Sequence, residues 1–199
     1  MDKPWAHLPR PWIADIGCGG APAPFANILV DKFVGGTQHR NVPLATDGKL
    51  FVEGDIMALP FEDGELDFVY CNHLLEHLDR PDLGLAELVR VSPHGLAFVP
   101  GLRSEAMMQH AHPEKPTAHK WLCWRDNTTL TMMWTEPGNR LALLQRLTLL
   151  GEWPADWKGQ WEELRICWGW GGWPSKPEIK MIDFVDLIPP ELLKEAQSK

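Results

Sequence analysis

The chain has 199 residues, of which 44% are hydrophobic and 23% are charged. This size and composition fit one ordinary globular domain and exclude a chain that is disordered throughout. The net charge of −8 gives a surface that repels a phosphate backbone, so no nucleic-acid partner is expected. The sequence lacks an apolar run of about 18 residues, and its N-terminus lacks the layout of a secretory signal. These features predict a cytoplasmic protein without a membrane span.

The first hundred residues alternate between short apolar runs and turn or helix signals. The apolar runs predict strands over residues 12–16, 28–30, 50–52, 66–71 and 96–99. Asp82 to Val91 has apolar residues at helical spacing, with Asp82 near its start, and predicts a helix. Runs that are apolar throughout are typical of strands covered on both faces. They therefore indicate an α/β fold with a mainly parallel sheet.

The second half differs in character, because nine of the eleven tryptophans fall at or after Trp121. Two strand-like segments, 121–124 and 128–134, flank a turn and predict a β-hairpin. Further elements are expected as a helix over 139–150, a helix and strand within 153–173, a strand over 179–187 and a helix over 189–196. The four cysteines lie far apart in the sequence and are expected to be reduced, mostly buried thiols.

The strongest local motif is Asp15-Ile16-Gly17-Cys18-Gly19-Gly20, at the end of the first predicted strand. Glycines after a strand allow positive φ and a close approach of the backbone to a ligand. A dinucleotide fingerprint would need glycine at position 22, where Pro22 stands. An acid two residues before the first glycine instead resembles the pattern of class I, Rossmann-like methyltransferases that use S-adenosylmethionine (SAM), in particular the methyltransferase type 11 group.

The resemblance continues in order along residues 12–100. It includes Asp31 at the end of the second strand and four further stretches: 53–61 (EGDIMALPF), 63–69 (DGELDFV), 75–78 (LEHL) and 87–91 (ELVRV). One departure is the short interval between Asp15 and Asp31, which contains Pro22 and Pro24. We therefore expect the first crossover helix to be shortened or irregular.

The resemblance implies a single domain over residues 1–199, with a cofactor-binding half (1–100) and a tryptophan-rich substrate or cover half (101–199). It implies a doubly wound, three-layer α/β/α fold with strand order 3-2-1-4-5 and an added antiparallel edge. It also implies SAM as cofactor, with the ribose hydroxyls on Asp31 and the adenine beside Asp55 and Ile56. The full set of implied cofactor residues is Asp15, Gly17, Cys18, Gly19, Asp31, Asp55, Ile56, Asn72 and His73.

In this fold the methyl acceptor arrives over the carboxyl ends of strands four and five. Polar residues within reach are Asn72, His73, Arg103, His112 and His119, of which His73 and His119 are the candidate catalytic bases because histidine titrates near neutrality. The motifs of nucleobase amino and cytosine C5 methylation are missing, which favours a small-molecule or glycan-like acceptor. A protein that binds SAM without catalysis, as a partner or regulatory subunit, is the alternative.

The segment His73-Leu74-Leu75-Glu76-His77 also allows a metal interpretation. Some small-RNA and ubiquinone-pathway O-methyltransferases bind a divalent ion through an acid-x-x-Glu-His motif and a later histidine. Here His73 replaces the first acid, and the later ligand would be His112 or His119. In the other interpretation, Glu76 and His77 only hydrogen-bond loops beneath the site, and this one is preferred: no metal is expected.

The tryptophans also have two interpretations. Most are expected to pack in the core, because large aromatic side chains bury well on sheet faces. The functional hypothesis is that the hairpin around Asp126, with Trp121 or Trp124, forms one wall of the acceptor pocket and that His119 lies at its base.

Overall fold

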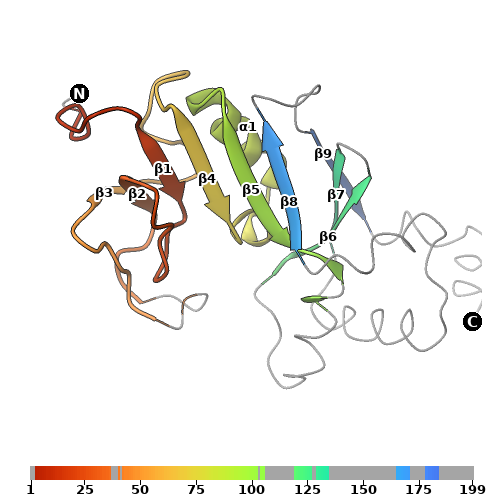
Figure 1. Cartoon of the computed structure of the whole chain (residues 1–199). Helices are drawn as coiled ribbons and strands as arrows, with labels where there is room; N and C mark the ends of the chain where they lie inside the picture. Colours follow the sequence, from red (N-terminus) through yellow and green to blue (C-terminus); the bar gives the residue numbers. More distant parts are fainter. Residues whose placement is uncertain are drawn as a thin grey trace, which may run out of the picture.

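The structure is a computed structural model, and it describes residues 3–36, 40, 42–102, 104–105, 119–126, 129–134, 165–170 and 178–183. Its main sheet has the order β3-β2-β1-β4-β5-β8 (Figure 1). These strands are β1 (Ile13–Ile16), β2 (Ile28–Asp31), β3 (Leu50–Glu53), β4 (Phe68–Asn72), β5 (Gly95–Pro100) and β8 (Arg165–Trp170). The first five are parallel to their neighbours, and β8 pairs antiparallel with β5. The predicted order and antiparallel edge are therefore confirmed.

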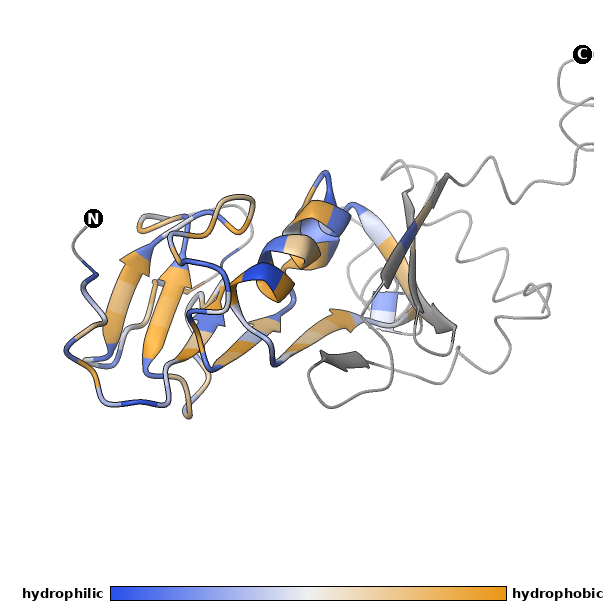
Figure 2. Cartoon of the chain, turned by 90° about the horizontal axis from the view of Figure 1, so that it is seen from above, coloured by the Kyte–Doolittle hydropathy of each residue, from blue (hydrophilic) through white to orange (hydrophobic). Residues whose placement is uncertain are grey.

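The central strands are apolar because both of their faces are covered. Ala14, Ile28 and Val69 have no exposed surface, and the strands of the main sheet are coloured mostly as hydrophobic in Figure 2. β1 lies between β2 and β4, with Asp15 opposite Leu29 on one side and Tyr70 on the other. Since the five strands are parallel, all their carboxyl ends lie at one edge of the sheet.

The predicted helix is α1 (Pro81–Val91), which connects β4 to β5 and contacts η1 and β9. It begins with a proline in its first turn, where no backbone N–H is needed, and its Leu85 and Leu88 are buried in the core. The segment before it is a single 3₁₀ turn, η1 (Leu75–His77). His73 precedes this turn with a φ of 54°, so positions 73, 76 and 77 do not lie on one face of a helix.

Residues 17–27, all of them described, connect β1 to β2 without a helix, as the two prolines predicted. Ala23, Ala26 and Cys18 from this segment instead pack against Leu29 as a small apolar cluster. Within the described residues, this face of the sheet is therefore covered by loop where a complete three-layer fold has a helix.

The predicted hairpin forms, but as part of a second sheet. β6 (Trp121–Asp126) pairs antiparallel with β7 (Thr129–Trp134), and β7 pairs parallel with β9 (Glu178–Asp183). Trp121 and Met132 of this sheet join the same buried cluster as the main core. The helices expected over 139–150 and 189–196 lie outside the described residues.

Arg90 near the end of α1 holds the segment between β3 and β4. Its guanidinium donates to the carbonyls of Phe61 (2.9 Å) and Leu59 (3.2 Å), while Glu87 accepts from Arg90 and from the Leu59 N–H. Arg90→Met leaves two partly buried carbonyls without these donors, so we expect a loss of about 1–3 kcal/mol in the free energy of unfolding. Urea denaturation measures it. The matched control is Arg80→Met, whose exposed pair with Asp82 contributes less than about 1 kcal/mol; equal losses in both variants would contradict this role of Arg90.

Candidate functional site

A cavity of about 910 Å³ lies along the carboxyl edge of the main sheet. This volume is near the upper end of the range of about 300–1,000 Å³ that is usual for small-molecule sites. All of the predicted cofactor residues line it: Asp15, Gly17, Cys18, Gly19, Asp31, Asp55, Ile56, Asn72 and His73. The fold thus brings this set to one space, while their contacts with a cofactor stay a prediction.

The glycine turn after β1 needs its glycines. Gly17 and Gly19 have φ values of 75° and 55°, a region that residues with a side chain rarely adopt. A Cβ on Gly17 would also lie 2.7 Å from Cδ2 of Leu74. The N–H groups of Gly17 and Cys18 donate to the Val30 carbonyl, which fixes the turn over the end of β2.

Asp15 is a buried carboxyl group, with 2% of its surface exposed. Burial raises its pKa to about 6, although the Ala23 N–H donates to Oδ2 at 2.7 Å and nearby Lys49 also favours the charged form. A cationic ligand beside this buried carboxyl group would favour its charged form, which burial disfavours.

Asp31, predicted to bind the ribose, has partners inside the protein. Its Oδ2 accepts the Gly19 N–H at 3.0 Å, and its Oδ1 accepts the Phe33 N–H at 2.8 Å. Arg40 Nη1 lies 3.5 Å from Asp31 Oδ2. Arg40 is a residue of this site that sequence reasoning missed. The loop between β2 and β3 carries no motif that would single out this arginine.

Asp55 and Ile56 follow β3 at the same edge. Burial raises the pKa of Asp55, but hydrogen bonds from Lys32 Nζ (2.8 Å) and the Met57 N–H (3.0 Å) outweigh it, so the pKa is lowered. Asp55 is therefore a carboxylate at neutral pH. Ile56 is buried beside it and lines the cavity.

The other end of the cavity follows β4. Asn72 and His73 line it together with His77 and Lys120. The His73 side chain is 40% exposed, and its Nδ1 lies 3.1 Å from Glu76 Oε1. Its left-handed backbone costs about 1–3 kcal/mol, and such strain is often kept at functional sites. Arg103 and His112, also predicted near the acceptor, lie outside the described residues.

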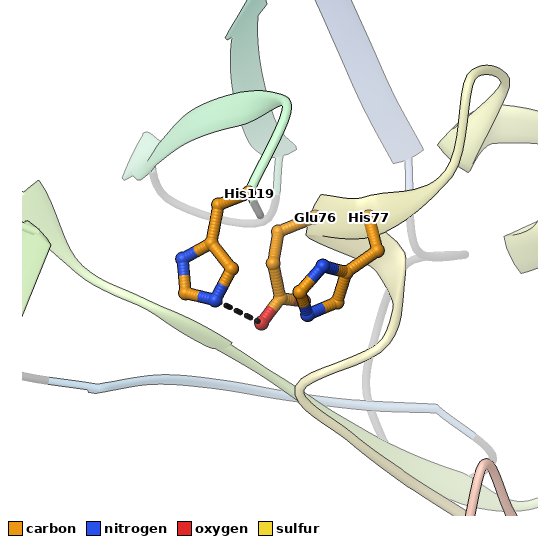
Figure 3. A group of neighbouring side chains, drawn as sticks. All are labelled: Glu76, His77 and His119. Atoms are coloured by element: carbon orange, nitrogen blue, oxygen red, sulfur yellow. Dashed lines mark ion pairs between the residues drawn. The ribbon is translucent and has the colours of Figure 1, made fainter. Parts of the chain in front are cut away.

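His119 lies next to the cavity, in contact with a residue that lines it. Its Nδ1 is hydrogen-bonded to the Glu105 carboxylate, and its Nε2 is 3.9 Å from Glu76 Oε1. Figure 3 shows His119, Glu76 and His77 turned toward one another, His119 from the segment before β6 and the other two from η1. His119 is not among the residues that line the cavity, whereas His77, whose ring centroid is 4.7 Å away, is. The role of His119 as a base stays a prediction. Sequence reasoning missed Glu105, because no motif surrounds it.

Trp121 of the β6–β7 hairpin does not line the cavity. This side chain is buried in the core, with 5% of its surface exposed, and its Nε1–H donates to the Leu78 carbonyl at 2.7 Å. The indole packs there because it buries a large apolar area and satisfies its N–H. The pocket-wall hypothesis is therefore wrong for Trp121, while the Trp124 side chain is outside the described part of the structure.

The cysteines behave as predicted where they are described. Cys18, Cys71 and Cys123 are buried thiols that form no disulfide. Burial raises the pKa of the Cys18 thiol to about 12 and that of Cys71 well above its usual value. Neither thiol is a nucleophile at neutral pH.

A parallel sheet of this order, with a glycine turn and strand-end acids around one cavity, is the arrangement of a Rossmann-like α/β domain. Residues 14–99 match the family model of the methyltransferase domain. The match covers less than half of the chain, and over this region the chain is similar to methyltransferase domains. Its limits agree with β1 and β5, the strands that bound the predicted cofactor half.

Two curated relatives are similar over the same region. Both are uncharacterized methyltransferases, one from Mycobacterium avium (strain 104) and one from Mycolicibacterium paratuberculosis (strain ATCC BAA-968 / K-10). Each is 39% identical over 92 residues, which is 41% of this chain and 36% of the relative. The match therefore spans little more than a third of the length of these relatives.

Solved structures with a similar arrangement include a SAM-dependent methyltransferase from Thermotoga maritima, described as a possible histamine N-methyltransferase. It is 20% identical, with 55% of this chain and 53% of that chain covered and a TM-score of 0.40. Another is the PH0226 protein from Pyrococcus horikoshii OT3, 19% identical, with 71% and 74% covered and a TM-score of 0.39.

Among the described residues, no helix has both the length and the apolar character that crossing a membrane requires.

Proposed function

We propose that the chain binds SAM and transfers its methyl group to a hydroxyl or amine of a small-molecule or glycan-like acceptor. The observation that carries this proposal is the convergence of three acids, Asp15, Asp31 and Asp55, on one cavity with the glycine turn. Each acid stands within or just after a different parallel strand, and SAM offers a cationic methionine part, a ribose diol and an adenine along its length.

In this arrangement the glycine turn lets the backbone approach the methionine part of the cofactor. Asp31 accepts hydrogen bonds from the ribose hydroxyls, for which a carboxylate is a stronger acceptor than a neutral group. Asp55 and Ile56 contact the adenine. Asn72 and His73 then lie toward the methyl group and the acceptor.

His73 is the preferred general base at the acceptor end. It lines the cavity with a partly exposed side chain, and its Nδ1 contact with Glu76 supports an orientation in which Nε2 is available to a substrate. Methyl transfer is an in-line displacement, so the protein's further contribution is alignment and exclusion of water. The alternative, a SAM-binding partner subunit without catalysis, would share the cofactor site and lack turnover.

The test compares Asp31→Asn with Glu53→Gln by isothermal titration with SAM, S-adenosylhomocysteine and NAD. Both acids end strands of the same sheet, but Glu53 does not line the cavity. The asparagine oxygen can still accept the Gly19 N–H, while the acceptor for the Phe33 N–H and the charge beside Arg40 are lost together with the ribose acceptor. We expect Asp31→Asn to weaken SAM binding about ten- to hundredfold, the effect of losing a charged hydrogen bond of about 1.5–3 kcal/mol.

Glu53→Gln should bind SAM like the wild type, and NAD should not bind. Unchanged SAM affinity in Asp31→Asn would refute the ribose assignment. Tight binding of NAD in place of SAM would overturn the proposed function.

A further inference from the structure

We propose that Glu76, His77 and His119 bind one divalent transition-metal ion and that Glu105 orients His119 for this purpose. One ligand atom from each of the first three residues lies within 4.8 Å of the other two. Two of them are neighbours on η1, and His119 reaches them from the segment before β6 (Figure 3). The fold thus brings together donors separated by more than forty positions in the sequence.

A second, independent observation concerns the buried carboxylates. Glu76 and Glu105 have no exposed surface, and in the described part of the chain the Oε2 atom of each has no hydrogen-bond partner. Buried polar oxygens are nearly always satisfied, because leaving one without a partner is costly. The Glu76 carboxylate, with one unpartnered oxygen beside a pair of imidazoles, points to a cation that this site takes up.

Glu105 determines which nitrogen of His119 faces the site. Its carboxylate binds Nδ1, and its own N–H donates to the Gly101 carbonyl, which anchors it after β5. Nε2 of His119 is therefore the nitrogen directed toward Glu76. A carboxylate on the far nitrogen of a metal-binding histidine fixes its tautomer and orientation and raises its basicity.

The donor set also indicates the kind of ion. Two imidazole nitrogens and one carboxylate oxygen suit zinc, iron, cobalt or nickel better than magnesium or calcium, which prefer oxygen ligands throughout. Three protein ligands leave coordination positions open, as in catalytic rather than structural sites. His77 also lines the cavity, so an ion held here would lie at the wall of its acceptor end.

This site differs from the sequence-based metal interpretation, in which position 73 supplies the first ligand. His73 is hydrogen-bonded to Glu76 Oε1 and is not a member of the cluster, while Glu105 supplies a carboxylate from a different part of the chain. The inference goes beyond the proposed function and does not depend on SAM binding.

The experiment is isothermal titration of chelator-treated full chain with ZnCl₂, and with CoCl₂ followed by absorption spectroscopy. We expect one ion per chain, a higher melting temperature with the metal, and a cobalt spectrum with nitrogen ligands. His77→Ala and His119→Ala should each weaken binding by more than about 100-fold, and Glu105→Gln by about 10- to 100-fold.

The matched control is His94→Ala, an exposed histidine before β5 at the opposite edge of the sheet, which should bind the ion like the wild type. Circular dichroism of the metal-free variants verifies that they fold, and SAM affinity measured on the same samples separates this site from the cofactor site. Absence of binding by the wild type overturns the proposal, and so does wild-type affinity in either His77→Ala or His119→Ala. A loss of affinity in His94→Ala as large as in these two would do so as well.

Discussion

Gly20→Ala is expected to lower the free energy of unfolding by about 1–3 kcal/mol, the usual range for overpacking a tight site. A Cβ at this position would lie 2.2 Å from Cγ2 of Val42 and 2.7 Å from the Pro43 carbonyl oxygen. The valine methyl can turn aside, but the carbonyl belongs to the backbone. The loop after β2 would therefore have to move away from the glycine turn.

This movement should also weaken SAM binding by at least about tenfold. The Ala45 N–H donates to the Gly19 carbonyl, and Gly19 in turn donates to Asp31, so a shift of the loop disturbs the predicted ribose site. Gly35→Ala is the matched control, because nothing lies within 4 Å of its added Cβ. Urea denaturation and titration with SAM measure the two effects; similar behaviour of both variants would contradict the expectation.

The second large effect concerns Asp15 and pH. Its pKa of about 6 in the folded chain exceeds the usual value, so between pH 4 and 6 the folded state binds a proton that the unfolded state has lost. By linkage, the contribution of Asp15 to stability is complete below about pH 4 and is lost as the pH rises to about 6. A difference of about 2 in pKa corresponds to roughly 3 kcal/mol at neutral pH.

Asp15→Asn removes this titration while its amide oxygen can still accept the Ala23 N–H. We therefore expect the variant to be more stable than the wild type at pH 7 by up to about 3 kcal/mol, and the difference to shrink toward pH 4. Denaturation at several pH values measures it, and subtracting the two proteins removes the opposite contribution of ion-paired acids such as Asp55. A constant difference over this range would contradict the buried-carboxyl explanation.

SAM binding should offset the stability that the folded chain loses when Asp15 is charged at neutral pH. A cationic ligand beside Asp15 favours the carboxylate, so SAM affinity of the wild type should increase as the pH rises from about 5 to 7. In Asp15→Asn the affinity should be weaker and nearly independent of pH over this interval.

The main sheet could be predicted because its strands are short, apolar and separated by turn residues. Only their ends differ: residues 66–71 were expected as one strand, but β4 begins at Phe68. Leu66 and Asp67 instead donate their N–H groups to the carbonyls of Val91 and Trp12. The pairing of β7 with β9 was not predicted, because an apolar pattern marks a strand without specifying a partner fifty residues away.

The candidate site likewise has residues that could be predicted from the sequence and residues that could not. Asp15, Asp31 and Asp55 each stand at a fixed place relative to a strand, so a linear pattern finds them. Arg40, between β2 and β3, and Glu105, in the helical residues after β5, reach the site through side-chain contacts, and no spacing rule encodes such contacts. The left-handed backbone of His73 was also missed, since histidine gives no signal for it.

The connection between β1 and β2 has a further electrostatic consequence. In a dinucleotide-binding fold, the helix after the first strand points its N-terminus at the ligand, and the partial positive charge there attracts a diphosphate. Residues 17–27 form no helix, so this chain presents no such charge at the glycine turn. The charged groups at that end of the cavity include the carboxyl groups of Asp15 and Asp31 and the guanidinium of Arg40. We therefore expect the electrostatic field at this end of the cavity to disfavour a diphosphate.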